Sequence, residues 1–227
     1  MIQVLDRGYV RLENKMGSDL TIVNSARVSY DKKSEELTEK DKGLIRFLIR
    51  EGHTSPLRHA MMTFEIYAPL MVARQWWKYV VGSDHTMDSW NESSRRYLSE
   101  DEHFYIPGSH EWRGKPANSK QGSAGPVDTI LGISLTDNLL RHIDSSMELY
   151  RMALEDGVAP EQARLFLPAY GMYVRWYWTA SLQAVLHFLD QRLEHDAQKE
   201  IQLYAEAVEQ YVTREFPEVY QAWRDQR

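Results

Sequence analysis

The sequence predicts one α/β or α+β domain covering residues 1–227. Segments of alternating polarity, typical of strands, fall at 2–12, 61–66 and 173–179, and segments with apolar residues at helical spacing lie between and after them. We find no internal repeat and no low-complexity stretch in the sequence. The composition, 43% hydrophobic and 26% charged, suits a single well-packed core.

The first sixty residues combine a strand with a capped helix. Residues 2–12 are expected to form one strand, and Asn14 beyond them is a turn residue. Thr38 suits the N-cap of the helix that follows, with Asp41 at its third position. The apolar stripe of this helix ends before Gly52, a residue that commonly terminates helices.

The stretch from Arg74 to Tyr97 organises the rest of the chain. The helix predicted over 69–79 buries one apolar face and projects Arg74 and Lys78, four residues apart, from another. Residues 91–96 then gather an amide, a carboxylate, two hydroxyls and two guanidinium groups, which are suited to binding a phosphate. The alternative interpretation is a solvated turn that carries a charge cluster. The predicted apolar face consists of Leu70, Ala73, Trp77 and Val80.

A segment rich in glycine and proline separates the two halves of the chain. Residues 107–126 show no periodicity, and loops of this length inside compact domains are usually functional. We therefore expect 107–126 to be a mobile lid. Beyond it we expect a helix ending at Gly157, another beginning near Pro160, and helices over 180–195 and 197–214.

The composition excludes several classes of function. A net charge of −6 provides no general basic field, so we expect no nucleic-acid partner. No apolar run is long enough to span a bilayer, and the first residues lack the apolar core of a signal peptide, so we expect a cytoplasmic protein without a membrane partner. The chain has no cysteine, so it has neither a thiolate nucleophile nor a thiolate metal site.

A search for catalytic motifs leaves a set of anion-binding groups. The eight histidines lack the spacing of a metal site, and we expect no metal. The chain contains no G-x-S-x-G elbow, no P-loop and no dinucleotide-binding glycine motif. Arg192, in the second half of the chain, stands out because it follows an apolar run. Its alternative interpretation is an exposed arginine paired with Glu194 or Asp196.

Several segments resemble the flavin-dependent thymidylate synthase family. The stretch Ser89–Tyr97 (SWNESSRRY) matches the second half of the family signature, and five further segments resemble family sequence in the same order along the chain. These segments are SARVSY at 25–30, GHTSPLRH at 52–59, APLMVARQWW at 68–77, ARLFLP at 163–168 and LDQRLEHDAQKEI at 189–201.

The chain departs from the family pattern beside this signature. Lys78, Tyr79 and Val80 stand where the family has Arg-His-Arg, and a short insertion separates them from Ser89. Ser181 and His187 occupy positions where the family usually has asparagine. A family histidine near Arg192 is displaced, with His195-Asp196 in its place.

The resemblance implies a mixed β-sheet flanked by helices and a homotetramer whose active sites are shared between subunits. It implies methylation of dUMP to dTMP, with FAD as cofactor, methylene-tetrahydrofolate as carbon donor and NADPH as reductant. The alternatives are a UMP C5-methylase of a nucleoside antibiotic pathway and a non-catalytic nucleotide-binding homologue. By resemblance, Arg192 is catalytic and the nucleotide is bound by Gln75, Lys78, Glu92, Ser93, Ser94, Arg95, Arg96, Arg164 and Arg192. The flavin is bound by Ser55, Lys78, Tyr79, Val80, Glu92, Ser181, Leu182, Gln183 and His187, and His53 lies on the folate side.

Overall fold

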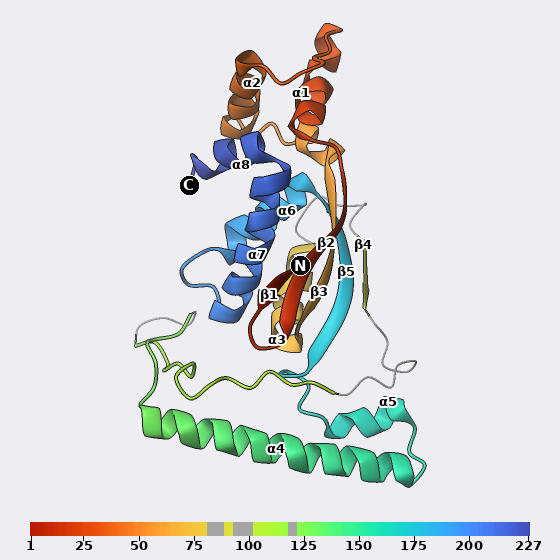
Figure 1. Cartoon of the computed structure of the whole chain (residues 1–227), viewed down its shortest axis with the longest axis vertical. Coiled ribbons are helices and arrows are strands. Elements are labelled where there is room, and N and C mark those ends of the chain that lie inside the picture. Colours follow the sequence, from red (N-terminus) through yellow and green to blue (C-terminus); the bar gives the residue numbers. More distant parts are fainter. Residues whose placement is uncertain (81–88, 93–101, 118–121) are drawn as a thin grey trace.

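A computed structural model describes residues 1–80, 89–92, 102–117 and 122–227. Helices and strands alternate along much of the chain, as Figure 1 shows. The strands are β1 (Ile2–Val4), β2 (Gly8–Met16), β3 (Met61–Pro69), β4 (Ser89–Glu92) and β5 (Tyr173–Ser181). The α-helices are α1 (Asp19–Arg27), α2 (Glu39–Arg50), α3 (Leu70–Val80), α4 (Thr129–Glu155), α5 (Pro160–Ala163), α6 (Leu182–Arg192), α7 (Lys199–Glu215) and α8 (Pro217–Arg224). The 3-10 helices are η1 (Val28–Tyr30), η2 (Ser55–His59) and η3 (Arg164–Phe166).

The five described strands form one sheet in the order β1-β2-β3-β5-β4. Every pairing among them is antiparallel, so the expectation of a mixed sheet was wrong. β3 and β5 pair over their full length, from Met61 opposite Ser181 to Pro69 opposite Tyr173. The long segment between them, which includes α4, gives the chain room to return in the opposite direction. The fold is therefore α+β with an antiparallel sheet.

The strand predicted over 2–12 is a hairpin. β1 and β2 pair antiparallel, with Val4 opposite Gly8, and the chain turns between them. Leu5 occupies the left-handed region there, with a φ of 58°. β2 then runs past Asn14 to Met16, so Asn14 lies inside the strand.

The start of α2 follows the sequence prediction closely. The Thr38 hydroxyl accepts from the backbone N–H of Asp41, and the Asp41 carboxylate accepts from the backbone N–H of Thr38 at 2.9 Å. This reciprocal capping box satisfies two backbone donors that the first turn would otherwise leave open. The helix ends at Arg50, and Gly52 follows it with a φ of +66°.

One face of the sheet is covered by α3, α6 and α7, which also pack on one another (Figure 1). The central side chain of this layer is Trp76, which is fully buried and stacks on Phe188 with ring centroids 4.3 Å apart. α3 buries Val72, Ala73 and Trp76, whereas Trp77 is only half-buried. The apolar face of α3 is thus rotated slightly from the predicted one.

α4 lies across one end of the sheet, apart from the main helical layer (Figure 1). It begins at Thr129, because the Asp128 side chain accepts from the backbone N–H groups of Ile130 and Leu131 and so caps the helix. Its inner side joins a small separate core. The buried members of that core are Phe104, Ile143, Met147 and Leu167.

The described part of the 107–126 segment is held in place by specific contacts, two of which involve Thr136 of α4. Trp112 donates to Thr136 at 2.9 Å, Thr136 donates to the Pro107 carbonyl at 2.9 Å, and Arg113 forms an isolated bridge with Pro126. Opening of this segment as a lid stays a prediction, which hydrogen exchange in the presence and absence of ligands would test.

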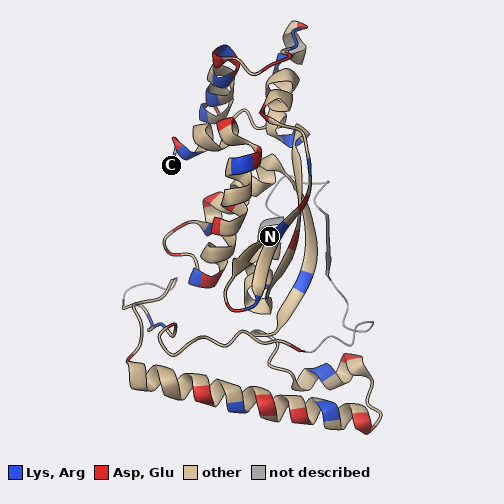
Figure 2. Cartoon of the chain, viewed as in Figure 1, with Lys and Arg blue, Asp and Glu red and all other residues tan. Residues whose placement is uncertain are grey.

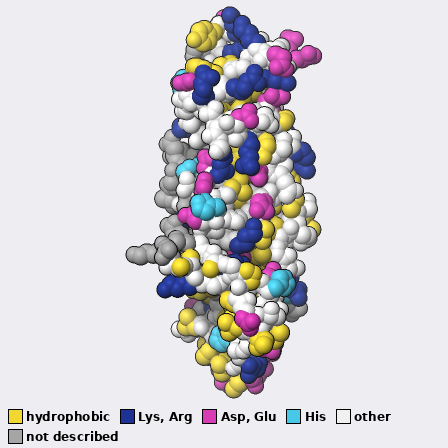
Figure 3. All heavy atoms as spheres, turned by 90° about the vertical axis from the view of Figure 1, so that its left-hand side faces the viewer, with side chains coloured by type: hydrophobic (Ala, Val, Ile, Leu, Met, Phe, Trp, Pro, Cys, Tyr) yellow, Lys and Arg dark blue, Asp and Glu magenta, His cyan; other side chains and the backbone are white. Residues whose placement is uncertain are grey.

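Charges of both signs alternate over the helices and over the face drawn in space-filling form (Figures 2 and 3). On that face, lysine and arginine side chains lie among aspartate and glutamate side chains and do not form a continuous basic surface (Figure 3). Within the described residues, no helix combines the length and apolar character that crossing a membrane requires.

Candidate active site

A polar cavity of about 440 Å³ lies where the end of α6 and the start of α7 meet α3. The cavity forms because the chain between α6 and α7 loops away from the sheet, while α3 packs against both helices. Both charged and amide side chains face it, so it suits a polar ligand. The lining residues are Gln75, Gly122, Gln191, Arg192, Glu194, Asp196, Ala197 and Gln198.

Arg192 is the last residue of α6 and its side chain enters this cavity half-buried. Its Nη2 atom donates to the backbone carbonyl of Gln75 at 3.3 Å, which ties the guanidinium to α3. Glu194, the partner expected under the alternative interpretation, pairs with Arg227 at 3.0 Å. The structure therefore brings Arg192 and Gln75 together, although they lie far apart in the sequence.

A network of side chains behind Gln75 was not predicted from the sequence. The Gln75 amide donates to Gln198 Oε1, Gln198 donates to Glu200 Oε2 at 2.8 Å, and Glu200 pairs with Arg113. Glu200 is only 4% exposed, so this charge is compensated inside the protein. The available signal was a glutamine and a glutamate two residues apart at the start of a helix, within the family-like segment at 189–201.

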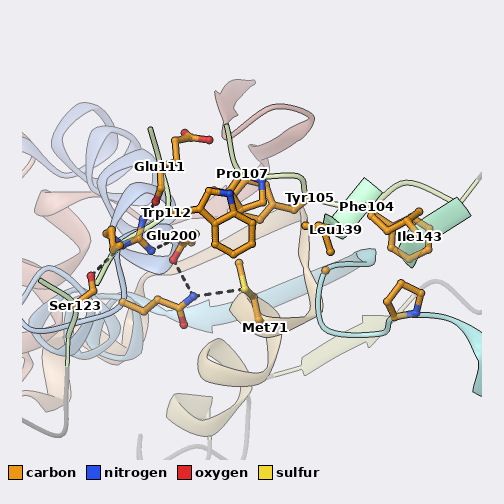
Figure 4. A pocket seen from close by; sticks show the side chains of 14 residues that line it. Met71, Phe104, Tyr105, Pro107, Glu111, Trp112, Ser123, Leu139, Ile143 and Glu200 are labelled. Atoms are coloured by element: carbon orange, nitrogen blue, oxygen red, sulfur yellow. Dashed lines mark hydrogen bonds and ion pairs between the residues drawn. The ribbon is translucent and has the colours of Figure 1, made fainter. Parts of the chain in front are cut away.

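A second pocket of about 360 Å³ lies on the other side of this network (Figure 4). Its walls are mostly apolar and include Trp112, Tyr105 and Leu139, while Glu200 and Glu111 mark its polar end. Burial, and then the neighbouring carboxylates of Glu111 and Glu200, raise the pKa of Tyr105. The Tyr105 phenol thus remains protonated at neutral pH. Gln198 lines both pockets and separates them.

Lys78 and Arg164, which were also predicted to bind the nucleotide, do not line this cavity. Lys78 is exposed one turn further along α3 than Arg74. Arg164 is exposed in η3, where its Nε donates to the Glu161 carbonyl at 3.1 Å, and it does not line this cavity. The residues predicted to bind the phosphate lie outside the described residues: Ser93, Ser94, Arg95 and Arg96. The side chains of Tyr79, Val80 and Glu92 are not described either.

Comparison with known proteins decides the family. Residues 11–218 match the family described as "Thymidylate synthase complementing protein". A flavin-dependent thymidylate synthase of Thermosipho africanus is 37% identical over 221 residues, which cover 97% of this chain and 92% of the relative. The chain belongs to the flavin-dependent thymidylate synthase family. The sequence resemblance is thereby confirmed.

Further relatives of the family agree with this assignment. A flavin-dependent thymidylate synthase of Thermus thermophilus is 38% identical over 99% of this chain and 78% of the relative. A crystal structure described as a UMP/dUMP methylase PolB from Streptomyces cacaoi, bound with 5-Br dUMP, superposes with a TM-score of 0.84. That structure is 30% identical and covers 99% of this chain and 97% of its own. The chain is an enzyme of a flavin-dependent family.

Of the residues predicted to bind the flavin, Ser55 lies in η2, Ser181 ends β5, and Leu182, Gln183 and His187 lie in α6. η2, which contains Ser55, packs against α6, and the Leu182 N–H donates to the Ala60 carbonyl at 2.8 Å. Ser55 is exposed, while Gln183 and His187 are half-buried, so all three present polar groups that suit a phosphate-bearing cofactor. The remaining two side chains serve the fold. Ser181 caps α6 by accepting from the Ala184 N–H at 3.2 Å, and Leu182 is fully buried.

His53, predicted to lie on the folate side, is exposed just before η2. Its imidazole meets the Phe47 ring edge-on, with centroids 5.5 Å apart. His53 therefore lies close in sequence to Ser55, on the same connection between α2 and β3, where it could contact a ligand bound beside the flavin. That role stays a prediction.

Proposed function

We propose that this enzyme methylates C5 of a uridine monophosphate, converting dUMP to dTMP, in the cavity lined by Arg192 and Gln75. The observation that supports the proposal most directly is the hydrogen bond that the Arg192 guanidinium donates to the Gln75 carbonyl, at 3.3 Å, in a polar cavity. A fixed cation of this kind is complementary to the O2–N3–O4 edge of a uracil ring, which gains negative charge when C5 becomes nucleophilic.

The absence of cysteine from the chain gives Arg192 its importance. Without a thiolate to add to C6, the ring must be activated by charge stabilisation. The guanidinium donates N–H groups only and keeps its positive charge at all working pH values. Because it is held in place before the reaction, no reorganisation is needed as charge develops on the ring.

Methylene-tetrahydrofolate is the proposed carbon donor and FAD the proposed cofactor. A methylene group must gain a hydride to become a methyl group, and reduced flavin, regenerated by NADPH, supplies that hydride when bound. Ser55, Lys78, Gln183 and His187 would hold the flavin, and His53 would border the folate. Lys78 supplies a cation where the family has Arg-His-Arg, so it would face the cofactor pyrophosphate.

The phosphate of the nucleotide is assigned to the segment that follows β4. Ser94 and Arg96, with Ser93 and Arg95, provide hydroxyl and guanidinium donors in consecutive positions. Glu92, the last residue of β4, carries a carboxylate that only accepts hydrogen bonds, so it would complete the nucleotide site without binding the phosphate. Arg164 would complete the nucleotide site from a neighbouring subunit, because it is exposed in η3 beside α4 and away from the cavity of its own chain.

We infer that the enzyme assembles as a homotetramer through α4. Apolar side chains along this helix are exposed to an extent that a solvated helix does not need, and η3 adds more beside them. A second copy of the chain would cover this surface and bring Arg164 to the neighbouring active site. The exposed residues are Ile130 (80%), Leu131 (49%), Ile133 (49%), Leu149 (46%), Met152 (51%), Leu165 (83%) and Phe166 (48%).

A second candidate substrate is UMP. The Streptomyces cacaoi methylase of similar fold is described in complexes with both 5-Br dUMP and 5-Br UMP, the latter at a TM-score of 0.83 and 28% identity. A C5-methylase of UMP in a specialised nucleoside pathway would use the same ring chemistry and the same Arg192. The two candidates differ only in the sugar that the site accepts.

The test is methyl transfer by purified enzyme reconstituted with FAD. We expect a yellow protein whose flavin absorbance bleaches with NADPH, and which transfers carbon from labelled methylene-tetrahydrofolate to dUMP. A parallel assay with UMP separates the two candidate substrates. Reactions without folate or without reductant serve as controls. A protein that binds the nucleotide but takes up no FAD and transfers no carbon would instead be a non-catalytic homologue.

A further inference from the structure

Four side chains form a hydrogen-bonded chain that leads from the 102–117 segment to the cavity of Arg192. Arg113 pairs with Glu200, Glu200 accepts from Gln198 at 2.8 Å, and Gln198 accepts from Gln75. Figure 4 shows the Glu200 end of this chain between the labelled Trp112 and Met71, with its contacts drawn as dashed lines. The network thus joins the buried carboxylate at the start of α7 to the amide beside Arg192.

The direction of every hydrogen bond in this chain is fixed by its charged end. A guanidinium can only donate and a carboxylate paired with it can only accept, so Gln198 must turn its NH₂ group toward Glu200. The second proton of that NH₂ group faces Met71 Sδ at 3.5 Å. Only the carbonyl oxygen of Gln198 then remains for Gln75, which must in turn present its own NH₂ group. Gln75 Oε1 is left as the acceptor that the side chain can offer to the cavity.

We propose that Glu200, acting through Gln198, sets the orientation of the Gln75 amide and thereby selects a base with an N–H donor at its edge. This inference rests on the proposed function. Uracil offers N3–H as a donor between two acceptor oxygens, which matches Gln75 Oε1 and the donors of Arg192. Cytosine carries an acceptor at N3 and a donor at N4, so it would place its N3 lone pair against Gln75 Oε1. Arg113, Gln198 and Glu200 are positioning residues.

Glu200→Gln tests the inference because it should reverse the whole chain. Arg113 still only donates, so the amide introduced at position 200 turns its oxygen toward Arg113 and its NH₂ group toward Gln198. Gln198 then flips, Gln75 flips with it, and an NH₂ group faces the cavity. We expect the affinity for dUMP to fall about tenfold and the affinity for dCMP to rise. The dissociation constant for dCMP divided by that for dUMP should therefore fall by about tenfold or more. Titration calorimetry on the FAD-loaded full-length enzyme measures both constants.

Three further variants separate orientation from stability. Glu200→Asp retains an acceptor that cannot donate, so it should keep the preference for dUMP. Gln198→Met removes the hydrogen bonds to Glu200 and Gln75 but keeps the volume of the side chain. The preference for dUMP over dCMP should therefore become smaller without reversing. Glu65→Gln is the matched control, since Glu65 is also buried (6% exposed) and paired with an arginine, Arg11 at 2.8 Å, but does not line either pocket. Its preference should equal that of the unmodified enzyme.

The outcomes are distinguishable. An unchanged ratio in Glu200→Gln, or in Gln198→Met if the first variant fails to fold, overturns the positioning role and leaves the proposed function standing. An unmodified enzyme that binds dUMP and dCMP equally well also overturns the positioning role. An enzyme that binds neither nucleotide contradicts the proposed function itself. Melting temperatures of all variants establish which of them fold.

Discussion

Replacement of Arg192 by alanine separates a catalytic role from a structural one. The structural cost should be small, because the hydrogen bond from Arg192 Nη2 to the Gln75 carbonyl on the cavity side is 3.3 Å long, which is at the long end for a hydrogen bond. A bond of that kind contributes about 1 kcal/mol to stability. A preorganised donor to a developing negative charge contributes far more to the reaction, on the order of 10²–10³ in rate, or about 3–4 kcal/mol.

The assay is single-turnover methyl transfer by enzyme whose flavin has been reduced beforehand. Arg192→Ala should retain its flavin and still be reduced by NADPH, yet transfer carbon to dUMP at least about a hundredfold more slowly. Nucleotide affinity should fall less than turnover, since the guanidinium interacts most strongly with the charge of the transition state. Arg192→Lys keeps a cation but loses the planar fork, so its rate should lie between the two.

Arg214→Ala is the matched control for this experiment. Arg214 also lies in the last turn of its helix, α7, where it pairs with Glu215 at 2.7 Å, but it is far from the cavity lining. Its turnover should be nearly that of the unmodified enzyme. Near-normal transfer by Arg192→Ala would refute the reasoning, because it would make Arg192 a structural residue and require another group to activate the ring.

Three further predictions concern binding, packing and pH. Arg96→Lys should weaken nucleotide binding about tenfold, because the ammonium cannot bind phosphate bidentately, and unchanged Michaelis constants for dUMP and UMP in Arg96→Ala would locate the phosphate site elsewhere. Trp76→Ala should lower the free energy of unfolding by about 3–5 kcal/mol, since Trp76 is fully buried, whereas Tyr170→Ala at a 65% exposed position should change it little; denaturation at one protein concentration compares them. The Thr38 hydroxyl, which donates to Asp41, is the main cause that lowers the pKa of the Asp41 carboxyl. The stability that this carboxylate contributes is therefore present above its unfolded pKa and is lost as the pH falls through its folded pKa. The difference in melting temperature between the enzyme and Asp41→Asn should shrink as the pH falls from about 6 to about 3. A constant difference would contradict the assignment.

Local features of the fold could be predicted from the sequence because their causes are local. The capping box of Thr38 and Asp41 needs only residues three apart, and the structure has it where the sequence indicated. The turn at Leu5 could not be predicted, because leucine rarely adopts a positive φ and gives no turn signal. The direction of β5 relative to β3 depends on how the long connection between them is routed, which no local pattern encodes.

Some residues of the candidate site could likewise be predicted from the sequence, whereas others could not. The family resemblance led us to expect both Gln75 and Arg192 at the nucleotide, and the structure brings the two residues to one cavity. Gln198 and Glu200 lie in the same recognised segment as Arg192, but their importance depends on Arg113, which arrives from a different part of the chain. A contact between residues 113 and 200 leaves no signature in either stretch of sequence.

The order of strands in the sheet has a consequence for how the enzyme folds. β4 precedes β5 in the sequence, yet it occupies the outer edge and pairs with β5, not with β3. β4 therefore has no template until the chain has been made as far as residue 181 and β5 has docked on β3, a closure over a long loop that costs entropy before contacts repay it. The segment proposed to bind the nucleotide phosphate directly follows β4. During synthesis, the enzyme should thus acquire its nucleotide affinity late, after most of its core has formed, and nucleotide binding by a refolding chain would report that the sheet is complete.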